Sequence, residues 1–142
     1  MSEEKKVTVE IESVILDLGD DGAPENNDKT SVRAEGIYRY GEKASVISYC
    51  EKEDGEESQS TITVTEGGVT VKRSGRSDYV FEFIEGKSTV SVYTVPPYSF
   101  DTEIFTRKIR RSLDCDGGEI SLIYDMTIGG AKKKTRMKVR VR

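Results

Sequence analysis

The sequence predicts an all-β domain folded as an antiparallel closed or nearly closed barrel of about 8–11 strands. Apolar residues alternate with polar ones in many short runs, and turn signals separate the runs at roughly ten-residue spacing. No window of a dozen residues shows a helical period. So many hairpin-linked strands need two packed sheets or closure, and closure removes the unpaired edge that a terminal strand would otherwise expose.

The first and last runs show the alternation most clearly. Residues 6–16 place Val7, Val9 and Ile11 on one face, with polar residues on the other. Near the end of the chain, Val139 and Val141 alternate with basic residues, so we expect them to face inward together with Met137.

Two further runs refine the picture. The strand around residues 32–40 contains Gly36, which suggests a bulge or a sharp bend. The segments 98–105 and 107–115 read as two short strands.

The chain of 142 residues fits one domain, which we assign to residues 1–142. We expect a short N-terminal tail at residues 1–5. Residues 18–30 are dense in Gly, Asp, Asn and Pro, so they predict a flexible acidic loop.

Composition excludes several functional classes. The chain has no histidine, which removes Ser-His-Asp and Cys-His nucleophiles and His-dependent zinc sites. We therefore expect no enzyme activity, no cofactor and no metal. The net charge of −4 predicts solubility more than any partner.

Location follows from other absences. No stretch has the charge and apolar pattern of a signal peptide or the length of a membrane span, so we expect a cytoplasmic protein with no membrane partner. The two cysteines, Cys50 and Cys115, are interpreted as small buried apolar residues.

Three segments carry a resemblance to a known family. They are Arg73-Ser74-Gly75, then Ser88-Thr89-Val90 continuing through Tyr93 to Pro96, and Asp116-Gly117-Gly118-Glu119-Ile120-Ser121-Leu122 with Tyr124. With these, the chain resembles the small bacterial calycin-like β-barrel proteins of the YwiB type, a family with no assigned function. The resemblance implies a barrel similar to lipocalins and fatty-acid-binding proteins, some of which hold apolar ligands, and it brings no catalytic residues.

The candidate ligand site lies on the predicted inner face. Arg73 and Arg111 share the phase of apolar neighbours, so both could bind a carboxylate or phosphate inside the barrel or at its mouth. Tyr38, Tyr93 and Tyr124 could line the same cavity. The alternative, which we favour for each arginine, is pairing with an interior carboxylate or contact with solvent at a strand end.

A basic surface patch follows the last strand. Alternation places four cations on one face, about 7 Å apart: Arg136, Lys138, Arg140 and Arg142. Such a row could follow a nucleic-acid backbone, and Lys108 with Arg110 might extend it. No aromatic residue is interleaved to stack bases, so we favour a solvated face paired with acidic residues such as Glu10.

Taken together, the sequence favours a non-catalytic binding module for a small apolar or anionic ligand. The alternative is a protein-interaction or structural barrel with a solid core, including a homodimer. Nucleic-acid binding through the basic strand ranks below both.

Overall fold

The barrel is built from antiparallel strands, and the computed structural model describes residues 4–18, 24–53 and 55–142. Its ten strands within these residues follow the chain in the order β1 (Glu4–Leu18), β2 (Pro24–Arg39), β3 (Ala44–Glu53), β4 (Glu56–Thr65), β5 (Gly68–Ser74), β6 (Tyr79–Phe83), β7 (Ser88–Val95), β8 (Tyr98–Asp114), β9 (Gly117–Ile128) and β10 (Ala131–Val141).

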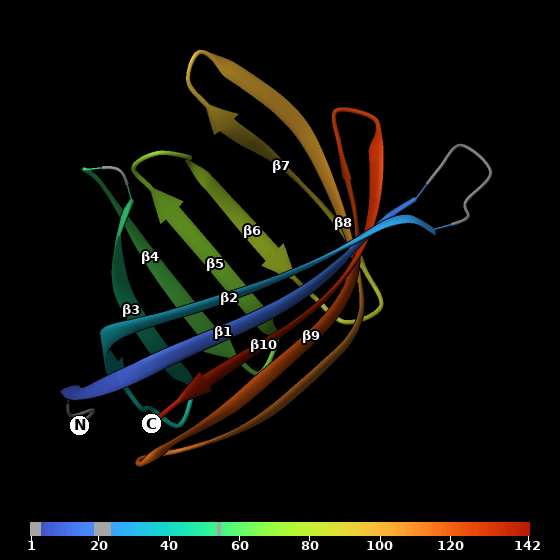
Figure 1. Ribbon diagram of the computed structural model, residues 1–142. Coiled ribbons are helices and arrows are strands. Elements are labelled where there is room, and N and C mark those ends of the chain that lie inside the picture. The colour runs from blue at the N-terminus through green and yellow to red at the C-terminus, as the bar shows by residue number, and fades with distance from the viewer. Residues whose placement is uncertain (1–3, 19–23, 54) are drawn as a thin grey trace.

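The last strand pairs with the first, as the sequence predicts. The order across the sheet is β6-β5-β4-β3-β2-β1-β10-β9-β8-β7, so β10 lies between β1 and β9 (Figure 1). Its register with β1 runs from the pair Val9–Val141 to the pair Asp17–Lys133. The fold is thus a nearly closed, all-β antiparallel barrel.

Two narrow junctions divide this barrel. β2 pairs with β3 only over the segments 36–39 and 46–49. Among the described residues, no ladder joins β6 to β7, and a single bridge links Asp78, just before β6, to Thr94 of β7. One half therefore contains β3 to β6, and the other contains β7 to β10 with β1 and β2 (Figure 1).

Side chains rather than a ladder hold β6 and β7 together. The Ser91 hydroxyl donates to the Val80 carbonyl at 2.6 Å, and the Thr89 hydroxyl donates to the Glu82 carbonyl at 2.6 Å. Two β7 hydroxyls thus bond carbonyls of β6 where a paired strand would supply backbone N–H groups. We call this junction the seam.

Alternation along the strands produces the core. Within β10, Val139 and Val141 are buried, Met137 is half-buried, and the basic side chains between them point outward, as predicted. Every strand except β7 contributes at least one buried apolar side chain. β2 contributes Tyr38 and β8 contributes Ile104. Burial of this apolar surface is the main favourable contribution to folding.

Part of the expected loop and part of the expected tail belong to strands β2 and β1. Residues 24–30 belong to β2 and pair with β1, so only residues 19–23 of the expected loop 18–30 lie outside the described residues. Likewise, Glu4 and Lys5 of the expected tail 1–5 begin β1, and residues 1–3 lie outside the described part. The prediction was wrong because backbone pairing with β1 supplies ladder hydrogen bonds whatever the polarity of the side chains.

Two local expectations also need correction. Residues 98–114 form one strand rather than two, with a register irregularity between Thr106 and Lys108 that changes which side chains face inward. Gly36 sits in a regular ladder rather than in a bulge. A Cβ at this position would lie 2.4 Å from the Ser48 carbonyl oxygen, so glycine permits the close approach of β2 to β3.

Candidate functional site

The inner face of the barrel carries polar groups at its two ends and apolar side chains between them. Ile47, Ile62 and Leu122 are at most 1 % exposed and pack in the middle. Because successive hairpins lie at alternate ends, Arg73 near the β5–β6 turn and Arg111 near the β8–β9 turn stand at opposite ends (Figure 1). The predicted ligand site is therefore split in two.

A pocket of about 410 Å³ opens at the end that holds Arg111. We call it the mouth pocket. Three chain segments line it: residues 40–45 around the β2–β3 turn, residues 64–66 before the β4–β5 turn, and residues 111–114 at the end of β8. The pocket thus spans both halves of the barrel.

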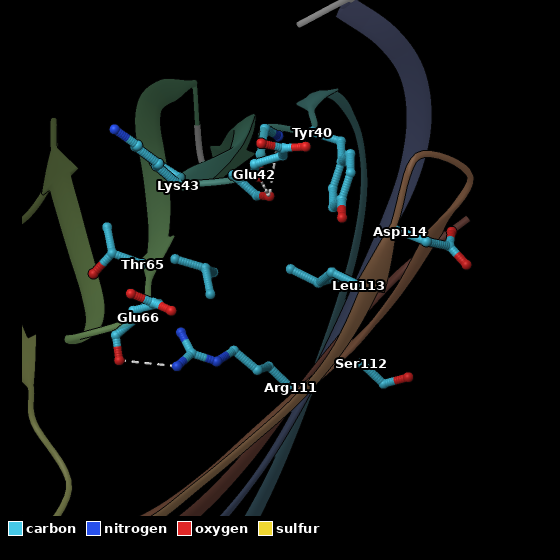
Figure 2. Close-up of a pocket in the computed structure, with 13 residues that line it drawn as sticks. Tyr40, Glu42, Lys43, Thr65, Glu66, Arg111, Ser112, Leu113 and Asp114 are labelled. Atoms are coloured by element: carbon cyan, nitrogen blue, oxygen red, sulfur yellow. Dashed lines mark hydrogen bonds between the residues drawn. The ribbon is translucent and has the colours of Figure 1, made fainter.

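Arg111 is the cation that reaches into the mouth pocket. Figure 2 shows Arg111 and Leu113 pointing into it, whereas Ser112 and Asp114 point away. The irregularity earlier in β8 sets this phase. One terminal nitrogen of Arg111 donates to the Glu66 carbonyl oxygen at 2.9 Å, which links β8 to the β4–β5 turn.

Tyr38, predicted to line a ligand cavity, instead joins two strands close to this pocket. Its side chain is buried, and its hydroxyl donates to the Asp114 carbonyl oxygen at 2.7 Å. Burial raises the pKa of the Tyr38 phenol. The neighbouring Tyr40, which the sequence analysis did not select, lines the pocket and points into it (Figure 2).

At the other end, Arg73 pairs with an interior carboxylate, as the alternative interpretation expects. Its terminal nitrogen lies 3.4 Å from a Glu51 carboxylate oxygen, and both side chains are about four-fifths buried. The Arg73 Nε is buried with no hydrogen-bond partner. Pairing with Glu51 offsets part of the cost of burying this cation.

Aromatic rings surround this ion pair and cross the seam. Tyr79 stacks on Phe81 at 4.0 Å between ring centroids, and Tyr93 of β7 lies 5.6 Å from Tyr79. Burial raises the pKa of the Tyr79 phenol to about 12, although the Arg73 cation opposes the shift. Tyr93 therefore contributes to packing between the two halves.

Tyr124 lies deeper on the inner face. It is buried and packs against Phe83 with a centroid distance of 4.7 Å. Burial raises the pKa of its phenol above the ordinary value, because the charged form would be desolvated. Tyr124 and Tyr93 thus lie toward Arg73, whereas Tyr38 lies toward Arg111.

The basic patch of β10 is largely ion-paired. Lys138 and Arg140 lie 3.7 Å and 3.5 Å from the same Glu119 carboxylate oxygen. Arg142 lies 3.9 Å from Glu10. Arg136 has no ion pair or hydrogen bond with any described side chain. Three of the four cations therefore show the pairing that the sequence favoured.

Comparisons with known proteins give the family. A family model described as a domain of unknown function (DUF1934) matches residues 9–139. The chain belongs to this family. It is 32 % identical over 129 residues to the uncharacterized β-barrel protein YwiB of Bacillus subtilis (strain 168), covering 91 % of this chain and 87 % of that protein.

The family likeness extends to the structure. The crystal structure of YwiB from Bacillus subtilis matches 99 % of this chain and 94 % of its own, with a TM-score of 0.83 and 29 % identity. The resemblance inferred from the three sequence segments is therefore confirmed, as is the barrel fold. The description of the DUF1934 family assigns no activity.

Three further observations on this DUF1934 barrel concern metal ligands, membrane-spanning helices and the two cysteines. The described residues hold no group of three or more His, Cys, Asp or Glu side chains arranged to bind a metal. Nor do they include a helix long and apolar enough to cross a membrane. Cys50 and Cys115 are exposed and free rather than buried, because each lies on the outward phase or at a turn.

The sequence missed residues that line the mouth pocket. Tyr40 and Leu113 flank a turn and a strand end, where alternation no longer tells which way a side chain points. The Glu66 carbonyl that accepts from Arg111 is a backbone group with no side-chain signature. One signal was available: alternate hairpins meet at one end of a barrel, which places the β2–β3 and β4–β5 turns at a shared mouth.

Proposed function

We propose that this chain is a non-catalytic binding module for a small ligand with an apolar body and an anionic group. The position of Arg111 in the mouth pocket carries this proposal. A guanidinium has five N–H donors, and among the described residues that of Arg111 makes one hydrogen bond, to the Glu66 carbonyl. The remaining donors suit the fork of a carboxylate or phosphate.

The walls of the pocket support an apolar body for this ligand. Leu113 points into the pocket opposite residues of the β4 end, including Val64, and Tyr40 offers both a ring and a hydroxyl. A volume of about 410 Å³ lies within the range of small-molecule sites. The solid middle of the barrel limits such a ligand to the mouth.

Composition and cysteine exposure support two further parts of the proposal, that the protein is non-catalytic and that it works in the cytoplasm. The chain has no histidine to act as a base near neutral pH, which favours binding over catalysis. Cys50 and Cys115 are exposed and unpaired, which favours a reducing compartment such as the cytoplasm.

Titration with anilinonaphthalene sulfonate, an apolar anion whose fluorescence rises on binding, tests the site. We expect Arg111→Gln to weaken binding about tenfold, since it removes the charge-assisted hydrogen bonds. The matched control is Arg140→Gln, which removes the same charge from the outer wall, where Arg140 pairs with Glu119. Native mass spectrometry of freshly purified protein would then show whether a ligand is carried through purification.

The outcome of this titration is decisive. Equal weakening by both substitutions would mean that probe binding depends on the net charge of the protein. Unchanged binding in both variants would mean that the probe binds outside the mouth pocket. Either result would overturn the mouth pocket as the site.

One observation favours a second candidate, self-association along the seam. Val90 and Val92 of β7 are 82 % and 51 % exposed, and Val80 of β6 is 45 % exposed. These valines flank strand edges without a ladder, which a second copy of this chain could cover by pairing. Sedimentation velocity should then show a dimer that Val90→Asp dissociates. A monomer at all concentrations would exclude this candidate.

A further inference from the structure

A row of side chains on the outer wall combines cations with apolar residues and contains no carboxylate. Register pairs align Lys29, Val14, Arg136, Ile123 and Lys108 across β2, β1, β10, β9 and β8. Leu122 and Tyr124 beside Ile123, and Thr135 beside Arg136, are buried, so Ile123 and Arg136 face outward, and alternation from the buried Val7, Val9 and Ile11 puts Val14 on the same outer face. With strands about 4.8 Å apart, successive cations in the row, which lie two strands apart, are spaced about 10 Å.

A hollow of about 480 Å³ lies over part of this row. Its lining includes Val14 and Ile123, four cations, Lys108, Arg110, Arg136 and Lys138, and one carboxylate, Glu12. A second hollow of about 400 Å³ adjoins it and shares three of these residues, Val14, Ile123 and Arg136. The outer wall thus offers an apolar floor bordered by four cations and one carboxylate, which leaves an excess of positive charge.

Three of the four cations that line this hollow are unpaired among the described residues. Lys108, Arg110 and Arg136 have no ion pair or hydrogen bond with any side chain in the described part of the chain. Lys138 and Arg140, on the same strand as Arg136, pair with Glu119. Like charges held at about 7–10 Å repel one another, and a bound anion would relieve that repulsion.

From these observations we propose that the outer wall is a second binding site, which takes a phosphate-bearing ligand through Arg136, Arg110 and Lys108 over the floor of Val14 and Ile123. Guanidinium groups bind phosphate oxygens in pairs, and the ammonium of Lys108 adds a point charge. The phosphate comes from a soluble ester or from a lipid headgroup. A nucleic-acid strand fits less well, because the row offers no aromatic ring for base stacking.

Calorimetric titration with inorganic pyrophosphate tests this site on the whole chain. We expect binding that Arg136→Gln weakens about tenfold through loss of charge-assisted hydrogen bonds. The matched control is Arg140→Gln, which removes the same charge from the same strand but from a cation already paired with Glu119. This control should bind pyrophosphate within about twofold of the unchanged protein.

A vesicle arm distinguishes the two sources of phosphate. Cosedimentation with phosphatidylcholine vesicles containing phosphatidic acid, compared with phosphatidylcholine alone, reports a lipid headgroup. Binding in either arm that depends on Arg136 and not on Arg140 supports the site. Equal loss in the two variants, or no binding in either arm, overturns it. Arg111→Gln should leave pyrophosphate binding unchanged, so this site and the mouth pocket fail independently.

Discussion

Alkaline pH should destabilise this barrel through the buried phenol of Tyr79. Burial raises the pKa of that phenol from 10.0 to about 12. Between these values the unfolded chain releases the proton while the folded chain keeps it. Stability from this group is thus present below pH 10 and is lost as the pH rises toward 12.

The size of the effect follows from the two pKa values. At pH 11 the difference amounts to about 1.4 kcal/mol, and it approaches about 3 kcal/mol above pH 12. Tyr79 is half-buried rather than fully enclosed, so screening by water makes these figures upper bounds. Tyr49 and Tyr124, whose pKa values are also raised by burial, should add to the loss in the unchanged protein.

Urea unfolding at pH 8 and pH 11 isolates the contribution of Tyr79. Tyr79→Phe should lose up to about 1.4 kcal/mol less than the unchanged protein over this interval, because phenylalanine does not titrate. Tyr98→Phe is the matched control, since Tyr98 is 65 % exposed. If Tyr79→Phe and the unchanged protein lose the same free energy, the phenol is not held protonated by burial and the reasoning fails.

Two further predictions concern the backbone. Ser91→Ala removes the hydroxyl that donates to the Val80 carbonyl. We expect urea unfolding to show that the free energy of unfolding falls by about 1 kcal/mol. An unchanged free energy of unfolding would mean that the stability of the seam does not depend on this bond. Gly118→Ala would place a Cβ 1.8 Å from the Ser112 carbonyl oxygen, whereas Gly130→Ala meets no atom within 4 Å, and both positions have positive φ. We expect Gly118→Ala to cost about 2 kcal/mol or more beyond Gly130→Ala in the same assay, and equal costs would contradict the close approach.

Alternation in the sequence was enough to predict which face most side chains occupy. Val139 and Val141 face inward because a strand with one buried face must keep its period of two. Alternation cannot tell how high along the barrel a side chain sits, since that depends on the register between strands. Arg73 and Arg111 therefore shared a predicted face but lie at opposite ends.

The remaining errors have equally local causes. Residues 24–30 look like a loop by composition, but pairing with β1 satisfies their backbone groups and makes them a strand. Residues 98–114 look like two strands because the irregularity between Thr106 and Lys108 shifts the phase of alternation, but β8 pairs with β9 on both sides of it. The seam could not be predicted from the sequence, because hydroxyl residues such as Thr89 and Ser91 are also common in strands that pair by an ordinary ladder.

The division of the barrel into two halves separates the two proposed sites physically. The bond from Arg111 to the Glu66 carbonyl crosses from β8 to the β4–β5 turn, so a ligand in the mouth pocket would contact both halves. The outer-wall row lies on β1, β2, β8, β9 and β10, all in one half. A ligand that bridges the halves should restrict their relative motion and protect amides of β6 and β7 from hydrogen exchange. A phosphate on the outer wall would not protect these amides in the same way, because it contacts strands of one half only.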